Sequence, residues 1–187
     1  MNGAPAVIAL RNAVLVLALA ALAAAGCFLI SGQFVVDYAL PSPFPAVGAP
    51  TGTLIGVGVD LNTLGEYRDH KRNLRRVDDV ALIGDFKNNT GSTANVEVWL
   101  VPSGTLTLPG NQLAVNGVRL WGPLSVAAGA TQRVDWNRST TLLVGRQALT
   151  DEIKGDGRFS LYIVVANGAF DLTVTHSAVI AVITAAE

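Results

Sequence analysis

An uncharged run of 18 residues, Ala13 to Ile30, lies near the start of this chain and follows Arg11, the only charged side chain in residues 1–30. Eighteen apolar residues are the lower limit for a helix that crosses a membrane, and a shorter run is typical of a signal peptide. In both cases the positive-inside rule leaves Arg11 in the cytoplasm. We therefore expect residues 31–187 to lie outside the cytoplasm, close to a membrane.

Three outcomes are open for the end of this run. Ala23-Ala24-Ala25 supplies small residues at −3 and −1 for a signal peptidase that cuts after Ala25. Ala24-Ala25-Gly26-Cys27 resembles the lipobox of bacterial lipoproteins, although Leu22 lies at −5 where that family has Leu at −3. This resemblance implies cleavage before Cys27 and attachment of lipid to its thiol. In the third outcome the run is an uncleaved helical anchor, and Cys27 is a small apolar residue within it.

Charge and cysteine content limit the class of partner. Residues 37–187 carry 12 Lys or Arg and 14 Asp or Glu, a net charge of −2, so they lack the basic excess of a nucleic-acid-binding domain. Cys27 is the only cysteine, which excludes an intrachain disulfide. About 150 residues are enough to form one hydrophobic core without such a crosslink. We expect one domain, with a membrane and an envelope protein as its partners.

After the N-terminal run, turn residues divide the chain into short β segments. Residues 31–52 contain Pro41, Pro43, Pro45 and Pro50 and form a stiff spacer or a first strand. Strands are predicted at 54–61, 80–86, 95–101, 112–120, 131–136, 158–166 and 170–184, and helices at 63–77 and at 139–154, the second with Ser139 as its N-cap. In the strand at 158–166, Val164 makes both faces apolar, which predicts a central strand covered on both sides.

This pattern predicts a mainly β domain over residues 53–187. A single antiparallel β-sandwich of immunoglobulin-like type, with two short helices in its connections, fits it best, and a small barrel is the alternative. The segment from Asp79 to Val101 has a hydrophobic strand, an Asn-rich turn and a second strand. It is similar to the sandwich domain of desiccation-linked late-embryogenesis proteins, with Asn88-Asn89-Thr90 in place of their Asn-Pro-Asn turn. The resemblance implies a sandwich fold and transfers no functional residue.

Few side chains are suited to catalysis or metal binding. His70 and His176 are the only histidines, the usual general bases near neutral pH. A two-residue period places His176 on the apolar face of the last strand, as a hydrogen-bonded side chain at the edge of the core. No nucleophile motif accompanies either histidine, and Asp60 with Asn62 is too few ligands for a calcium loop. We expect no catalytic residue, no metal and no cofactor.

Two tryptophans are candidates for binding. In the strand at 95–101, Glu97 and Trp99 share the less apolar face, and Trp121 precedes a Gly-Pro turn. An exposed Trp is typical of a binding hot spot. Large aromatic side chains are more often buried, however, and burial of Trp99 under a loop or helix is the competing interpretation.

The helix predicted at 63–77 has a basic face. Five cations fall at i, i+3, i+4, i+7 and i+8, namely Arg68, Lys71, Arg72, Arg75 and Arg76. Charged helical faces are usually solvated surface. The alternative is contact with anionic headgroups or an acidic partner, because each cation near an anionic membrane contributes about 1 kcal/mol of attraction.

Taken together, these features favour a non-enzymatic, membrane-tethered protein of the bacterial periplasm or cell envelope. Its β-sandwich is expected to bind or support a partner. A carrier of a lipid or other apolar ligand is the first alternative, and a secreted hydrolase is the second. An apolar cavity between the sheets would indicate the carrier, and polar groups clustered in a pocket would indicate the hydrolase.

Overall fold

The computed structural model describes residues 31–49, 51–102, 104–166 and 168–186. The segment 1–30, with its predicted helix and Cys27, lies outside these residues. Within them the chain is mainly β, with antiparallel sheets and a few short helices, as the sequence predicts.

The described part of the chain contains eleven strands. They are β1 (Ser31–Ala39), β2 (Phe44–Gly48), β3 (Thr53–Ile55), β4 (Val57–Asp60), β5 (Leu74–Asn88), β6 (Ala94–Pro102), β7 (Thr107–Pro109), β8 (Val118–Val126), β9 (Thr131–Val134), β10 (Arg158–Val165) and β11 (Phe170–Ala186). The connections hold η2 (Leu61–Thr63), α2 (Gly65–His70), η3 (Lys71–Asn73), η4 (Gly110–Gln112), α3 (Leu113–Asn116), α4 (Trp136–Leu142) and α5 (Arg146–Lys154).

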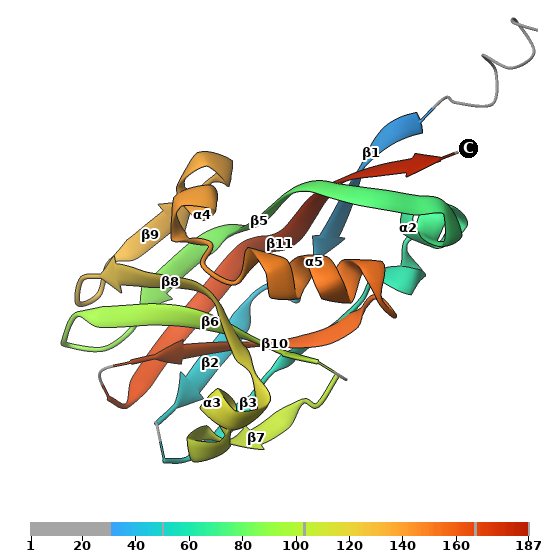
Figure 1. Cartoon of the computed structure of the whole chain (residues 1–187). Helices are drawn as coiled ribbons and strands as arrows, with labels where there is room; N and C mark the ends of the chain where they lie inside the picture. The colour runs from blue at the N-terminus through green and yellow to red at the C-terminus, as the bar shows by residue number, and fades with distance from the viewer. Residues whose placement is uncertain (1–30, 50, 103, 167, 187) are drawn as a thin grey trace, which may run out of the picture.

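Two larger sheets form two layers, and every strand pairing is antiparallel (Figure 1). The large sheet has the order β1-β11-β5-β9, with β2 also pairing with β11. The second sheet has the order β4-β10-β6-β8, and β3 and β7 form a separate ribbon. Residues 31–48 are therefore not a spacer: β1 and β2 follow one another along the same edge of β11. The chain between them is held by the Leu40 N–H, which donates to the Ser177 carbonyl oxygen at 2.8 Å.

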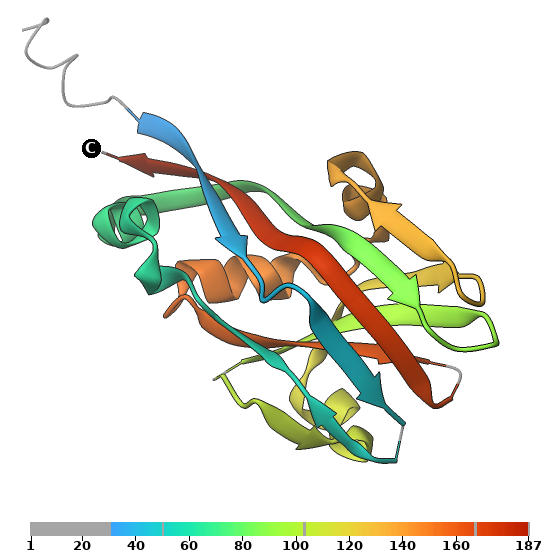
Figure 2. The same cartoon turned by 180° about the vertical axis from the view of Figure 1, so that it is seen from behind.

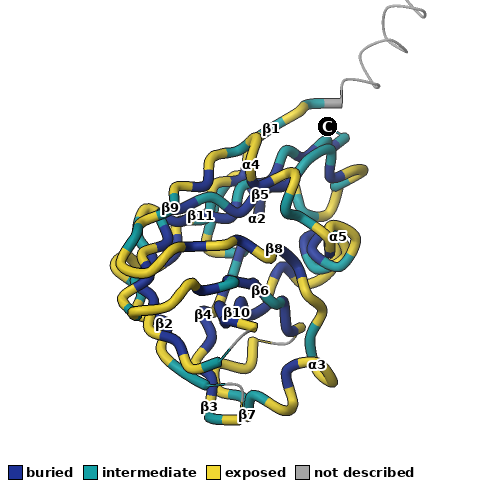
Figure 3. The backbone as a smooth tube through the Cα atoms, turned by 90° about the vertical axis from the view of Figure 1, so that its left-hand side faces the viewer, coloured by how far each residue is buried: buried dark blue, intermediate teal, exposed yellow. Residues whose placement is uncertain are grey.

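The hydrophobic core fills the space between the two layers (Figure 3). Phe86 of β5 and Trp121 of β8 stack across it with ring centroids 5.3 Å apart. Helix α5 packs against strands of both sheets and buries Leu149 and Ile153 completely. Each such aliphatic side chain removed from water contributes about 1.5–3 kcal/mol to stability. The hydrophobic residues described as buried run from Val36 to Ala185.

Strand β10 is central and covered on both faces, as predicted. It pairs with β4 on one side and with β6 on the other. Tyr162 and Val164 share one face, Ile163 and Val165 share the other, and all four are at most 8 % exposed. The Tyr162 hydroxyl donates to the Thr105 carbonyl oxygen at 2.7 Å, which fixes the segment before β7 over the outer face.

Helix boundaries are where the structure differs from the sequence prediction. The helix predicted at 63–77 consists only of α2 and η3, and β5 begins at Leu74. Leu74 pairs with Ala185, and Val77 pairs with Ile183 of β11. Ladder hydrogen bonds and burial against β11 outweigh the helical propensity of this charged segment, because propensity is a weak preference beside tertiary packing.

The second predicted helix is also divided. Asp135, not Ser139, is the N-cap of α4, and its carboxylate accepts the Arg138 N–H at 2.9 Å. Ser139 lies inside α4, where its hydroxyl accepts the Leu82 N–H at 2.8 Å and so ties the helix to β5. Helix α5 then ends before Gly155, as predicted. The strand expected at 112–120 begins only at Val118, because η4 and α3 precede it.

Candidate functional site

Three neighbouring strands of the large sheet depart from regular pairing at the same level. In β11 the register shifts between Thr175 and Ala178, and His176 has φ +50°. Opposite it in β5, Gly84 has φ +155°, and a Cβ there would lie 2.9 Å from the Ser177 Cβ. On the other side of β11, strand β1 has already ended, and the His176 N–H donates instead to Ser42 Oγ at 3.2 Å. Bulges of this kind redirect side chains out of a sheet and occur often next to functional sites.

The bulge brings His176 into solvent and beside a carboxylate. His176 Nδ1 lies 3.1 Å from Asp85 Oδ2, and the two side chains are 81 % and 26 % exposed. The predicted position of His176 at the edge of the core is therefore wrong. An extra residue in β11 shifts the alternation, and a one-residue shift moves a side chain to the opposite face.

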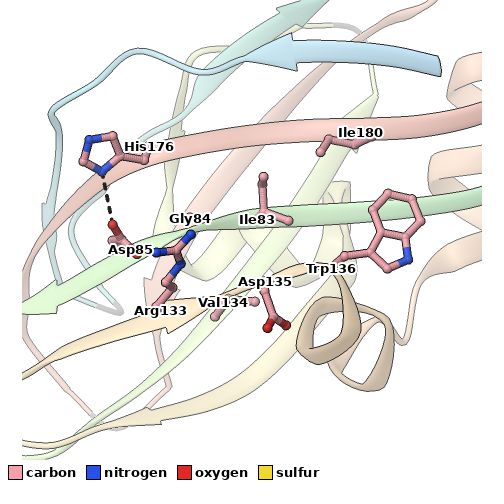
Figure 4. Close-up of a pocket in the computed structure, with 9 residues that line it drawn as sticks. All are labelled: Ile83, Gly84, Asp85, Arg133, Val134, Asp135, Trp136, His176 and Ile180. Carbon is pink, nitrogen blue, oxygen red and sulfur yellow. Dashed lines mark hydrogen bonds and ion pairs between the residues drawn. The ribbon is translucent and has the colours of Figure 1, made fainter.

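Beside the bulge lies an open pocket of about 480 Å³, here called the bulge pocket (Figure 4). It is lined by Ile83, Gly84, Asp85, Arg133, Val134, Asp135, Trp136, His176 and Ile180. These residues come from β5, β11, β9 and the start of α4. The half-buried Ile83 and Ile180 supply apolar surface, and the half-buried indole of Trp136 stands beside them.

The turn from β9 into α4 positions one side of this pocket. Arg133 pairs with Asp85 across the β5–β9 ladder, so both project from the same face of the sheet. Asp135 ends the strand and caps α4, and Trp136 is the first residue of that helix. The ladder, the cap and the helix start thus place a guanidinium, a carboxylate and an indole along the lining of the pocket.

The polar groups of the bulge pocket decide what chemistry it offers. Among the described residues, the His176 ring hydrogen-bonds to Asp85 and to no hydroxyl or thiol. Nor does the described part of the chain contain a group of three His, Cys, Asp or Glu side chains placed to hold a metal ion. The pocket combines apolar surface with hydrogen-bonding groups of both signs, the usual composition of a ligand site.

Trp99 lies in a second, smaller pocket. Its Nε1 donates to Glu97 Oε2 at 3.1 Å, which confirms that the two side chains share a face. Glu97 is only 9 % exposed, and Arg119 Nη1 lies 3.0 Å from its Oε1. Both carboxylate oxygens are therefore paired, which a buried charge requires. The pocket is about 150 Å³ and is also lined by Leu113 of α3, so Trp99 is partly covered by a helix.

Trp121 is not a surface residue. Its side chain is 0 % exposed and stacks on Phe86 between the two layers. The prediction that Trp121 is a candidate binding aromatic is therefore wrong. The Gly-Pro that follows it does not turn the chain away: Gly122 and Pro123 continue within β8, so Trp121 keeps an inward position in the strand.

The five predicted basic residues do not share one helical face. Arg68 lies in α2, Lys71 and Arg72 lie in η3, and Arg75 and Arg76 lie in β5. The structure nevertheless brings them to one end of the domain, beside the start of β1 and the end of β11 (Figures 1 and 2). We call this set of five residues the basic end.

Comparison of the chain with models of protein families, with curated proteins and with solved structures found no match. Within the residues described, no helix combines the length and the apolar character needed to cross a membrane. The grounds for a functional proposal are therefore the chemistry of the bulge pocket and the position of the basic end.

Arg133, Asp85 and Trp136 were not predicted from the sequence. One signal was present: Asp135 followed by a helical segment marks an N-cap, and the cap fixes where Trp136 begins its helix. The pairing of β9 with β5 joins residues almost 50 positions apart, and the bulge in β11 has no local sequence signature.

Proposed function

We propose that this chain is a non-enzymatic, membrane-tethered protein of the bacterial periplasm or cell envelope whose β domain binds a saccharide chain in the bulge pocket. In this proposal the N-terminal segment holds the domain at the membrane, either through lipid on Cys27 after cleavage before it or as an uncleaved helix. The two facing sheets, with the core between them, support classing the domain as a sandwich of immunoglobulin-like type.

The composition of the bulge pocket carries this proposal. A sugar ring has an apolar face of C–H groups and a rim of hydroxyls that both donate and accept hydrogen bonds. The Trp136 indole, Ile83 and Ile180 offer apolar surface to the C–H face of the sugar. The carboxylates of Asp85 and Asp135 accept hydrogen bonds and the Arg133 guanidinium donates them, which matches the rim of sugar hydroxyls.

The open shape of the pocket favours an extended ligand over an enclosed one. Arg133, Asp135 and His176 are all exposed, so the pocket opens to solvent along the outer face of the large sheet. A saccharide chain could therefore pass through the site with its neighbouring units in solvent. A pocket that buries a drug-sized ligand would instead cover most of the surface of that ligand.

A carrier of an apolar ligand is less well supported. The interior between the layers is filled by large side chains, among them Trp121, Phe86 and Leu124, each at most 1 % exposed. The pocket at Trp99 is apolar, but its 150 Å³ is below the roughly 300 Å³ at which ligand sites begin. The polar rim of the bulge pocket would also be costly to desolvate around a lipid tail.

The test is saccharide binding by residues 31–187 on a panel of cell-envelope oligosaccharides, followed by titration calorimetry with the tightest binder. Trp136→Ala should weaken binding about tenfold, since loss of an aromatic contact at a binding site costs more than about 1 kcal/mol. Arg138→Ala, on an exposed part of the same helix, is the matched control and should bind like the unmodified domain.

Two results would contradict the proposal. One is the absence of binding to every oligosaccharide on the panel. The other is equal affinity for the Trp136→Ala variant and the unmodified domain. Thermal unfolding of each variant, followed by circular dichroism, separates a lost contact from a lost fold.

A further inference from the structure

We propose that the basic end of the β domain docks on the anionic headgroups of the membrane to which the N-terminal segment tethers it. This inference rests on the proposed tethering. It assigns the orientation of the domain as well as a lipid-binding surface, because docking at this end points the opposite end, where β10 ends and β11 begins, away from the membrane (Figures 1 and 2).

The position of β1 is the first observation. Ser31 pairs with Ala186, and Gln33 pairs with Thr184, which in turn pairs with Arg76 of β5. The point where the N-terminal segment joins the domain is therefore two strands away from the basic residues. A chain that leaves the bilayer after Ile30 would bring this end of the domain to the surface first, with little linker between them.

The charge of this end is the second observation. Residues 65–77 contain five Arg or Lys and two Asp or Glu, a formal charge of +3 in a domain whose net charge is negative. Arg76 forms an ion pair with Asp78, and Arg68 Nε lies 3.5 Å from Asp69 Oδ1. Lys71 Nζ donates to Asn62 Oδ1 and to the Asp156 carbonyl oxygen, both of which are uncharged. Arg72 and Arg75 are exposed and have no ion-pair partner among the described residues. Their charges are thus available to an external anion.

The third observation is a hollow between the segment that carries these cations and β1. This hollow of about 200 Å³ is lined by Gly32, Gln33, Phe34, His70 and Ala185. Phe34 is half-buried, and its ring lies 4.8 Å from the His70 ring. Phe34 and His70 thus give this end of the domain a small aromatic surface beside the segment that carries the cations.

Anionic lipid is favoured over an acidic protein by the arrangement of these groups. The cations come from α2, η3 and β5 instead of from one element, and none of the five lines the hollow. A dispersed set of flexible cations suits a mobile layer of negative headgroups, to which each cation adds attraction without a fixed partner.

The experiment uses residues 31–187, which contain the whole of the described core and lack the N-terminal segment. Binding is measured by sedimentation with vesicles of phosphatidylcholine alone and with about 30 % phosphatidylglycerol, at about 50 mM and about 300 mM salt. The variant Arg72→Gln/Arg75→Gln removes two charges from the basic end. Lys87→Gln/Arg138→Gln removes two exposed charges elsewhere and is the matched control.

Binding should require phosphatidylglycerol and weaken at the higher salt, because screening shortens the reach of exposed charges. Each cation near an anionic surface changes the affinity about fivefold, so the basic-end variant, which lacks two cations, should bind about 25-fold more weakly. The control variant should change binding less than threefold. All variants should keep the circular dichroism spectrum of the unmodified domain.

Three outcomes would overturn the inference: no binding to anionic vesicles at low salt, an equal loss in both double variants, or tighter binding to a polyglutamate peptide than to the vesicles. The last outcome would assign the basic end to an acidic protein. Because the fragment has no N-terminal segment, none of these results depends on the tether. Failure of the tether would appear instead as a full-length chain that is absent from membrane fractions.

Discussion

At the scale of single residues, Tyr67 connects two parts of the chain that are 86 positions apart. Its side chain is 0 % exposed, and its hydroxyl donates to the Ile153 carbonyl oxygen at 2.7 Å, which joins α2 to α5. Lys71 Nζ lies 5.6 Å from the centre of its ring. Burial, together with the negative charges of Asp156 and Asp60, raises the pKa of the Tyr67 phenol to about 12.

This shift predicts a loss of stability in alkali. The pKa of Tyr67 is about 12 in the folded chain and 10.0 for an ordinary tyrosine. A raised pKa stabilises the fold fully below pH 10, and that contribution is lost as the pH rises through 12. Tyr67→Phe should cost about 1 kcal/mol at neutral pH through the lost hydrogen bond. The difference from the unmodified protein should then shrink and reverse above about pH 10.

Urea denaturation over this pH range measures the difference directly. Tyr38→Phe, at a half-buried position of β1, is the control for removal of a tyrosine hydroxyl outside the contact between α2 and α5. A Tyr67→Phe difference that stays constant from neutral pH to about pH 12 would show that the phenol does not ionise in the way its burial requires.

The position of His176 could not be predicted from the alternation of residues along β11. Simple alternation along β11 places it with the apolar residues of the core face, and every residue before the bulge follows that rule. The register shift between Thr175 and Ala178 then adds one residue to β11, so simple alternation no longer predicts the face on which a side chain lies. The structural context of the shift is not local: it lies opposite Gly84 of the neighbouring strand and beside the interruption between β1 and β2. A residue pattern read along one strand contains none of that information.

At the scale of elements, strands were predicted better than helices. The strands at 80–86, 95–101, 158–166 and 170–184 all lie within or overlap long strands of the structure, because alternation and β-branched residues carry a strong local signal. The segment 63–77 fits a helix and a strand about equally well in its apolar positions. Leu74 and Val77 face the core in either case, and pairing with β11 decides the outcome.

The bulge in the large sheet gives a prediction at this scale. Gly84→Ala places a Cβ at φ +155°, 2.9 Å from the Ser177 Cβ, so β5 and β11 must separate locally. Strained backbone of this kind costs about 1–3 kcal/mol, and the unfolding free energy should fall by that amount. Saccharide affinity should fall with it, since Ile83 and Asp85 flank the substituted residue.

Gly91→Ala is the control for this substitution. Gly91 lies in the turn between β5 and β6, has no positive φ and has no atom within 4 Å of an added Cβ. Its substitution should change the unfolding free energy by less than about 0.5 kcal/mol, as is usual at surface positions. Denaturant unfolding of the two variants measures the difference between their unfolding free energies. Equal stability of the two variants would contradict the structural role assigned to Gly84.

At the scale of the whole molecule, the proposed functions occupy separate regions. The basic end lies where β1 begins, and the bulge pocket lies farther along the outer face of the large sheet, beside β9 and α4 (Figures 1 and 4). A domain docked through its basic end would therefore leave the pocket open to solvent. Membrane attachment and ligand binding could then take place together, without competing for one surface.

The central claim is that this β domain lies outside the cytoplasm and stays attached to a membrane. Val115 of α3 is 77 % exposed, so Val115→Cys presents a thiol to any reagent that reaches the domain. Intact spheroplasts expressing this variant are treated with a membrane-impermeant maleimide and then lysed, and the membranes are pelleted. The unmodified chain, whose only thiol is Cys27, gives the background. The account predicts labelling before lysis, in the membrane pellet; labelling only after lysis, or recovery of the labelled chain in the soluble fraction, would contradict it.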